Sequence, residues 1–100
     1  MTLTETRVHA LALGTLRARL DARAAVYIAK YPALDLGARY RWVTERVAEA
    51  SYNGAGGTLE LGEDRVTVTL ELPFFAMLYR ERIEAFVLRE LDALVRADAS

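Results

Sequence analysis

The chain contains no cysteine and a single histidine, His9. Without thiols there can be no disulfide, thiolate metal site or cysteine nucleophile. One histidine cannot build a site with several imidazole ligands, and any Ser-His-Asp relay would have to use it. A lone histidine beside a strand-to-helix junction is more often a packed or capping side chain than a catalytic one. We therefore expect no catalytic residue, and we also expect no metal and no cofactor.

An excess of positive charge is also missing. Thirteen basic side chains face fourteen acidic ones, which leaves a formal net charge of −1. No run of basic residues is present that would neutralise a row of phosphates. We therefore expect no nucleic-acid partner.

Long apolar runs are absent. Nowhere do about eighteen apolar residues follow one another, so we expect no transmembrane segment. The first ten residues carry Glu5, Arg7 and His9 and lack the apolar stretch of a signal peptide. These features predict a cytoplasmic protein.

The chain is long and apolar enough to fold alone. Its 100 residues are 53% apolar and 27% charged, without a linker or low-complexity tract. We expect one domain over residues 1–100 with an ordered core from about 3 to 96. The tail Asp98-Ala99-Ser100 is expected to fray.

Two segments show helical periodicity. From about Leu13, apolar residues recur every three or four positions until Pro32 forbids continuation, which predicts a helix ending near residue 31. A second helix is predicted to begin at Pro73, which suits a first helical turn. Its expected apolar stripe contains Phe75, Tyr79, Ile83, Phe86 or Val87, Leu91 and Leu94.

Three segments predict strands. Residues 2–8 alternate and are rich in threonine. Residues 58–61 and 65–72 alternate about a tight turn at Gly62-Glu63-Asp64, which predicts a hairpin with one apolar and one polar face. The apolar face would carry Leu59, Leu61, Val66, Val68, Leu70 and Leu72.

The segment from Arg39 to Tyr52 is ambiguous, because its apolar residues fit both strand and helical spacing. We favour one extended strand, since Asn53-Gly54-Ala55-Gly56-Gly57 is a strong turn signal. The predicted fold class is α+β, in the order β-α-β-β-β-α, with two helices on one face of an antiparallel sheet.

Other candidate motifs have ordinary structural explanations. The neighbouring carboxylates Glu81 and Glu84, and Glu63 and Asp64, lie among arginines or in a turn, where solvent keeps both members ionised. The glycine-rich turn lacks the Lys-Ser/Thr of a phosphate-binding loop. We expect the protein not to be an enzyme, a reading that would change only if His9 lay beside a carboxylate in a cleft.

The start of the last helix carries an excess of large apolar residues. Phe74, Phe75, Met77, Leu78 and Tyr79 fall within six positions, and one helical face cannot bury them all. They predict a self-association or apolar-surface site, centred on Phe74, Phe75, Leu78 and Tyr79. Trp42 could extend this site. Alternatively, Trp42 with Tyr40, and Tyr52, could line an apolar ligand pocket, although packing on the helices is the simpler explanation.

Read from residue 8 to 95, the pattern resembles the polyhydroxyalkanoic acid system family, small bacterial proteins encountered with polyester-granule genes. The resemblance is carried by the following pieces, in this order: His9-Ala10-Leu11, Tyr40 and Trp42, Gly54 and Gly57, Leu59 to Leu61, Val66 to Leu72, Leu72-Pro73-Phe74-Phe75, Ile83, and Glu90-Leu91-Asp92-Ala93-Leu94.

The resemblance implies an association with polyhydroxyalkanoate granules or their metabolism. Our leading hypothesis is a non-enzymatic accessory protein, expected to be a homodimer, that attaches to an apolar surface or protein partner such as a granule or granule protein. The alternative is a small carrier that encloses a hydrophobic ligand, such as an acyl chain, between the helices and the sheet.

Overall fold

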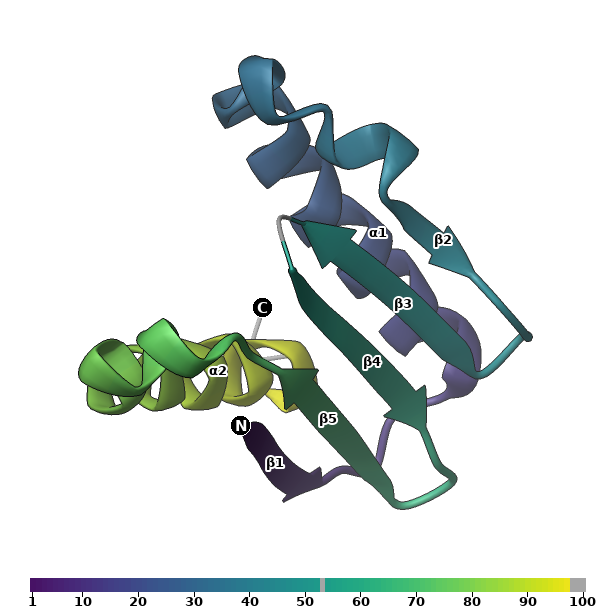
Figure 1. Cartoon of the computed structure of the whole chain (residues 1–100). Coiled ribbons are helices and arrows are strands. Elements are labelled where there is room, and N and C mark those ends of the chain that lie inside the picture. The colour runs from purple at the N-terminus through teal and green to yellow at the C-terminus, as the bar shows by residue number, and fades with distance from the viewer. Residues whose placement is uncertain (53, 98–100) are drawn as a thin grey trace.

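A five-stranded antiparallel sheet forms the centre of the protein. The computed structural model describes residues 1–52 and 54–97, so the first residue of the predicted glycine-rich turn and the tail expected to fray lie outside it. The strands are β1 (Thr2–Val8), β2 (Tyr40–Trp42), β3 (Val47–Tyr52), β4 (Ala55–Leu61) and β5 (Arg65–Glu71). Their spatial order is β1-β5-β4-β3-β2 (Figure 1).

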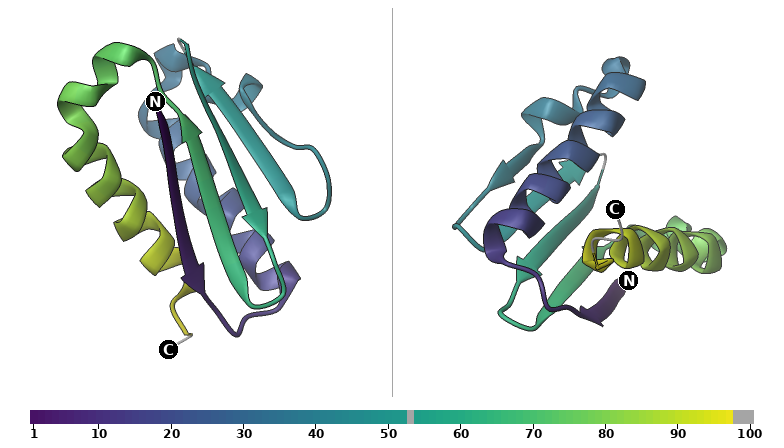
Figure 2. Two further views of the ribbon diagram at one scale, coloured as in Figure 1. Left: turned by 60° about the horizontal axis from the view of Figure 1, so that its bottom comes forward. Right: turned by 180° about the vertical axis from the view of Figure 1, so that it is seen from behind.

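Both long helices lie on one face of this sheet, as the α+β prediction requires (Figure 2). They are α1 (Leu13–Lys30) and α2 (Arg80–Val95), and the short 3₁₀ helices are η1 (Pro32–Leu34), η2 (Leu36–Ala38) and η3 (Phe74–Tyr79). α1 ends one residue before Tyr31, as predicted from Pro32. The two helices diverge from each other across the sheet, which leaves part of this face uncovered (Figure 1).

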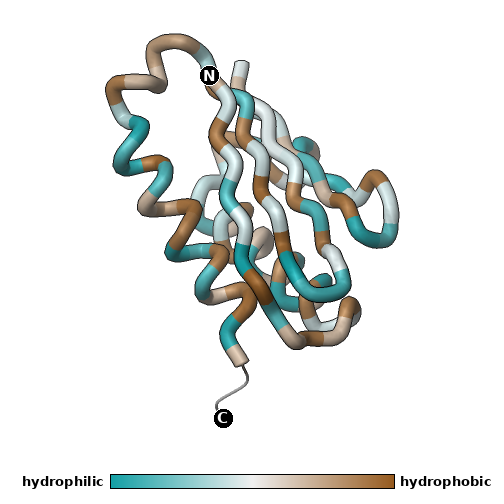
Figure 3. The backbone as a smooth tube through the Cα atoms, turned by 90° about the horizontal axis from the view of Figure 1, so that it is seen from below, coloured by the Kyte–Doolittle hydropathy of each residue, from teal (hydrophilic) through white to brown (hydrophobic). Residues whose placement is uncertain are grey.

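The β4–β5 hairpin has the predicted register. Leu61 pairs with Val66 and Leu59 with Val68, so the apolar side chains share the helix-facing side. Alternating apolar and polar residues along these strands are visible in Figure 3. β4 begins at Ala55, three residues earlier than predicted, because Gly57 still pairs with Leu70. A Cβ at Gly57 would lie 2.8 Å from Leu70 Cδ2, so the missing side chain lets Leu70 cover the strand.

The prediction of one extended strand over Arg39–Tyr52 is wrong. The segment forms two strands, and residues 43–46 reverse the chain between them. Thr44 Oγ1 accepts the backbone N–H groups of Arg46 (3.1 Å) and Val47 (3.0 Å), and Val47 O accepts the N–H of Val43 at 2.8 Å. A hydroxyl-centred turn of this kind carries no glycine or proline, which is why the sequence pattern hides it.

The last helix does not begin at Pro73. Pro73 precedes η3, six residues of 3₁₀ helix, and α2 begins at Arg80. Since a 3₁₀ helix has three residues per turn, the apolar stripe changes phase between η3 and α2. Phe75 and Tyr79 therefore do not join the buried stripe, which runs along α2 from Ile83.

The core lies near the end of the sheet that carries the β4–β5 turn. The largest fully buried side chains are Leu16 of α1, Leu61 and Val66 of the hairpin and Leu91 of α2. At this end α1, α2 and the sheet meet closely. The opposite end, where β5 leads into η3, contains most of the exposed apolar side chains described below.

Candidate apolar binding site

Five exposed apolar side chains of the six-residue segment η3 form what we call the apolar patch: Phe74, Phe75, Met77, Leu78 and Tyr79. Their exposed fractions are 85%, 63%, 52%, 85% and 54%. Figure 3 shows this stretch as a mostly brown, apolar part of the chain. Single exposed apolar residues are normal on protein surfaces, whereas five large ones within six positions are unusual and make this segment the candidate contact surface.

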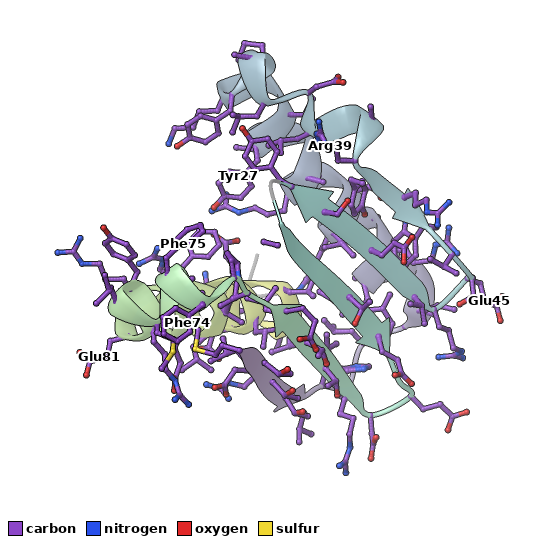
Figure 4. All side chains as sticks on the ribbon, viewed as in Figure 1. Tyr27, Arg39, Glu45, Phe74, Phe75 and Glu81 are labelled. Atoms are coloured by element: carbon purple, nitrogen blue, oxygen red, sulfur yellow. The ribbon has the colours of Figure 1, made fainter. Side chains whose placement is uncertain are left out.

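The 3₁₀ geometry of η3 explains this exposure. Side chains three residues apart lie in one row, which aligns Phe74 with Met77 and Phe75 with Leu78. Ala76, between these rows, points inward and is 7% exposed. Figure 4 shows Phe74 and Phe75 on different sides of η3. The backbone thus buries the smallest residue of the segment and exposes the large ones.

Trp42 does not lie with the patch. It belongs to β2, the strand at one edge of the sheet, whereas η3 follows β5 near the other edge. The Trp42 indole N–H donates to Asp21 Oδ1 of α1 at 2.9 Å, and the Arg17 guanidinium stacks 4.3 Å above its ring. The structure therefore brings together four of the five residues predicted for the site, and leaves Trp42 packed against α1.

Tyr40 shares the same carboxylate. Its hydroxyl donates to Asp21 Oδ1 at 2.8 Å, and its ring contacts Trp42 edge-on. Burial, followed by this hydrogen bond, raises the pKa of the Tyr40 hydroxyl above its ordinary value. These contacts attach the short strand β2 to α1.

An apolar groove of about 860 Å³ separates α1 from α2 on the helix-facing side of the sheet. Its floor is formed by side chains of β4 and β5, among them Leu59, Val68 and Leu70. Its walls contain Leu20, Ala24 and Ile28 of α1 and Ile83, Phe86 and Val87 of α2. The floor residues are only partly buried, because the diverging helices do not cover them.

The groove has a closed end and an open end. Leu91 and Leu94 of α2 are buried at the closed end, beside the core. At the open end, the lining residues Ala50 and Tyr52 of β3 are exposed to solvent. We call this open end the mouth. It lies at the same end of the sheet as η3, so the patch and the mouth are neighbours.

A polar clamp joins the two helices above the groove. Arg23 of α1 donates to both carboxylate oxygens of Glu90 on α2, at 2.7 and 2.8 Å, and the Tyr27 hydroxyl donates to Glu90 Oε1 at 2.8 Å. The Tyr27 and Phe86 rings meet edge to face, with centroids 6.0 Å apart. The hydrogen bond from Arg23 lowers the pKa of the Glu90 carboxyl, whereas burial raises the pKa of Tyr27.

His9 has a structural arrangement. The backbone N–H of Leu11 donates to His9 Nδ1 at 3.0 Å, which leaves the proton on Nε2 to donate to Gly62 O at 2.9 Å. The ring is 8% exposed and ties the end of β1 to the β4–β5 turn. Both ring nitrogens are occupied by backbone groups, and neither contacts a carboxylate.

The predicted carboxylate pairs stay apart from the groove. Glu84 faces Arg80 at 4.0 Å, and Glu63 and Asp64 are exposed in the hairpin turn. Across residues 1–52 and 54–97, no group of three or more His, Asp or Glu side chains could hold a metal ion. In the same residues, no helix is long and apolar enough to cross a membrane.

Of the three aromatic residues that the sequence offers as pocket lining, Tyr40 and Tyr52 line this groove and Trp42 does not. The aliphatic residues of its floor and walls were not predicted. The available signal was the small size of Ala48, Ala50 and Gly57, which lie on the helix-facing side where large residues would be expected. Small residues at such positions cannot fill the space between sheet and helices. The width of the groove depends on the angle between α1 and α2, and the periodicity of the sequence does not predict that angle.

Comparison with known proteins places the chain in a family. No curated protein and no solved structure matches it. One family model, described as "Putative polyhydroxyalkanoic acid system protein", matches residues 4–95. This match covers nearly the whole fold, from β1 to the end of α2. The chain belongs to the polyhydroxyalkanoic acid system protein family.

Proposed function

We propose that the protein is a non-enzymatic accessory protein that attaches through its apolar patch to the surface of a polyhydroxyalkanoate granule or to an apolar face of a granule protein. The observation that supports this proposal is the exposure of Phe74, Phe75, Met77, Leu78 and Tyr79 in one six-residue segment. Membership of the polyhydroxyalkanoic acid system protein family suggests that the apolar surface is the polyester of the granule.

The size of the patch suits reversible attachment. Burying one large apolar side chain contributes about 1.5–3 kcal/mol, so five contribute roughly 8–15 kcal/mol before other costs. Association itself costs about 4–15 kcal/mol in lost freedom of motion. Because these two ranges overlap, we expect attachment through one patch to be reversible.

We further propose a homodimer. Two copies on one particle would attach more firmly than one, because the second patch binds at high local concentration. This arrangement requires that the dimer interface leave the patch free. Light scattering should then give the mass of a dimer for both the parent and the Phe74→Ser/Phe75→Ser variant. If the variant is a folded monomer, the patch is the dimer interface and cannot also be the attachment surface.

Co-sedimentation with polyhydroxyalkanoate particles tests the attachment. The parent should sediment with the particles, and Phe74→Ser/Phe75→Ser should stay in solution while unfolding as cooperatively as the parent. The matched control is Val8→Ser/Val43→Ser, which removes two exposed apolar side chains at the opposite end of the sheet. Equal sedimentation of all three proteins would exclude the patch.

The groove favours a second function, binding of a hydrophobic ligand such as an acyl chain. Its volume of about 860 Å³ lies within the range of about 300–1,000 Å³ that is typical of small-molecule sites. Stoichiometric uptake of a fluorescent fatty-acid probe would support a carrier. Absence of uptake would leave surface attachment as the function.

A non-enzymatic role agrees with the local chemistry. His9 is held by two backbone groups, and Glu90 is held by Arg23 and Tyr27. Neither side chain is free to accept a proton from a substrate in the groove.

A further inference from the structure

We propose that the groove binds one unbranched aliphatic chain that ends in a carboxylate, with the hydrocarbon tail against the sheet and the carboxylate at Arg39 in the mouth. This inference rests on the second proposed function, ligand binding in the groove. It adds the chemical class of the ligand and its orientation.

The interior of the groove favours hydrocarbon. Its floor and walls are mainly apolar, including Leu59, Leu70, Leu20 and Ile28, and the polar groups of the clamp are already hydrogen-bonded to one another. Throughout residues 1–52 and 54–97, no buried side-chain nitrogen or oxygen lacks a hydrogen-bond partner. A polar ligand group placed inside would lose its water without gaining a protein partner, which costs free energy. The buried part of the ligand is therefore apolar.

The clamp restricts how a ligand enters. Arg23 and Glu90 connect α1 and α2 above the groove, and Tyr27 packs against Phe86 beside them. Since these contacts bridge the two helices, a chain that lies along the sheet beneath them enters end-on from the mouth. An unbranched chain can slide in end-on beneath the clamp without breaking it.

Three arginines border the groove, and they determine which head group the ligand carries. Arg39 is the one that can bind a ligand head group, because the other two already have protein partners. Arg19 donates to backbone carbonyls at the end of α2, and Arg23 is bound to Glu90. Arg39 forms no ion pair with any residue of 1–52 and 54–97, and its guanidinium lies 5.4 Å from the centroid of the Tyr52 ring. Figure 4 shows Arg39 near the end of β3, beside the mouth.

Arg39 and the groove match a carboxylate-ended chain better than a neutral one. A guanidinium presents paired N–H donors that suit the two oxygens of a carboxylate. Partial solvent exposure at the mouth keeps the head group hydrated, so only the tail has to leave water. Because solvent screens the ion pair between the carboxylate and Arg39, this pair contributes less to the binding free energy than it would inside the groove.

Calorimetric titration of the full chain with octanoate, decanoate, dodecanoate and decanol tests the proposal. One molecule should bind per chain, and each added methylene should tighten binding by about four-fold, equivalent to about 0.8 kcal/mol per buried CH₂. Arg39→Gln should weaken decanoate binding by about ten-fold and leave decanol unchanged. The control Arg65→Gln, an exposed arginine at the β4–β5 turn that does not line the groove, should leave decanoate binding unchanged.

Blocking the groove should remove binding altogether. Ala50→Trp places a large ring at an exposed lining position, where the substitution does not disturb the buried core. Both decanoate and decanol should then fail to bind. If Ala50→Trp does not fold, the amide resonances of the parent decide, because decanoate should shift those of Leu59, Val68 and Leu70 but not those of Val8 and Val43.

The outcomes separate this inference from the function on which it rests. If decanoate and decanol bind equally, and Arg39→Gln changes neither, the groove is a ligand site but the carboxylate assignment is wrong. If no chain binds the parent, both the assignment and the second proposed function fail. If binding survives Ala50→Trp or shifts only patch resonances, the ligand site is the patch.

Discussion

At the scale of single residues, polar side chains hold elements of the fold together. His9 is the clearest example, because it connects the β1–α1 junction to the β4–β5 turn through two hydrogen bonds to backbone groups. Asp21 does the same for β2 by accepting hydrogen bonds from Tyr40 and Trp42. The contacts of His9, the single histidine, and Trp42, the single tryptophan, thus stabilise the fold.

Replacing His9 by alanine should lower the free energy of unfolding by about 1–3 kcal/mol, because the N–H of Leu11 and the carbonyl of Gly62 lose their partners. Urea unfolding measures this loss, with His9→Asn as the variant that retains some hydrogen bonding. An unchanged midpoint for His9→Ala would show that the ring does not stabilise the junction.

Tyr40 predicts an alkaline limit to stability. Its pKa is raised in the folded protein, chiefly by burial, so the folded state holds the proton more tightly than the unfolded chain. The stabilisation is complete below the ordinary tyrosine pKa of about 10 and is lost as the pH rises above it. Parent unfolding should become easier across this range, and Tyr40→Phe should show a smaller change. Identical pH profiles would contradict this assignment.

At the scale of elements, η3 and the clamp carry the two proposed functions. η3 is a 3₁₀ helix with one inward residue, and this geometry creates the patch. The clamp joins α1 to α2 and sets the opening between them. Neither feature could be predicted from periodicity, since an α-helical stripe through Phe75, Tyr79 and Ile83 fits the sequence equally well.

The inward position of Ala76 gives a test of η3. Ala76→Leu should destabilise the fold by about 1–3 kcal/mol through overpacking, whereas Leu78→Ser should change stability by no more than about 0.5 kcal/mol. Thermal or urea unfolding of both variants provides the comparison. A larger loss for Leu78→Ser than for Ala76→Leu would mean that η3 presents a different face.

The clamp should weaken in acid. Because Arg23 lowers the pKa of Glu90 in the folded protein, the stabilisation is complete above the ordinary glutamate pKa of about 4.3 and is lost as the pH falls through the lower folded value. The parent should lose more stability than Glu90→Gln between neutral pH and this acid range. Equal losses would show that Glu90 contributes nothing to the pH dependence.

At the scale of the whole molecule, the sequence was sufficient for the fold class, the hairpin and both long helices. Alternation in residues 58–72 specifies one buried face, and Pro32 specifies the end of α1. It was not sufficient for the number of strands, because Thr44 makes the β2–β3 turn without glycine or proline. The groove depends on how far apart the helices lie, which is a property of the packed structure.

The segment η3, which carries the patch, follows β5 at the end of the sheet that holds the mouth of the groove (Figure 1), and the buried core lies near the opposite end. This arrangement separates the residues that stabilise the fold from those proposed to bind. Substitutions of the five exposed patch residues should therefore alter attachment without altering the fold. Substitutions in the core, such as Leu16→Ala, should cost about 2–5 kcal/mol of stability.

The most direct test of the central claim is adsorption of the parent and of Phe74→Ser/Phe75→Ser to a polyhydroxyalkanoate film, measured as equilibrium dissociation constants. Removing two large side chains from the patch should weaken binding by about 3–6 kcal/mol, or at least one hundred-fold, while Val8→Ser/Val43→Ser binds like the parent. If the patch variant and the parent bind the film with the same dissociation constant, the apolar patch is not the attachment surface.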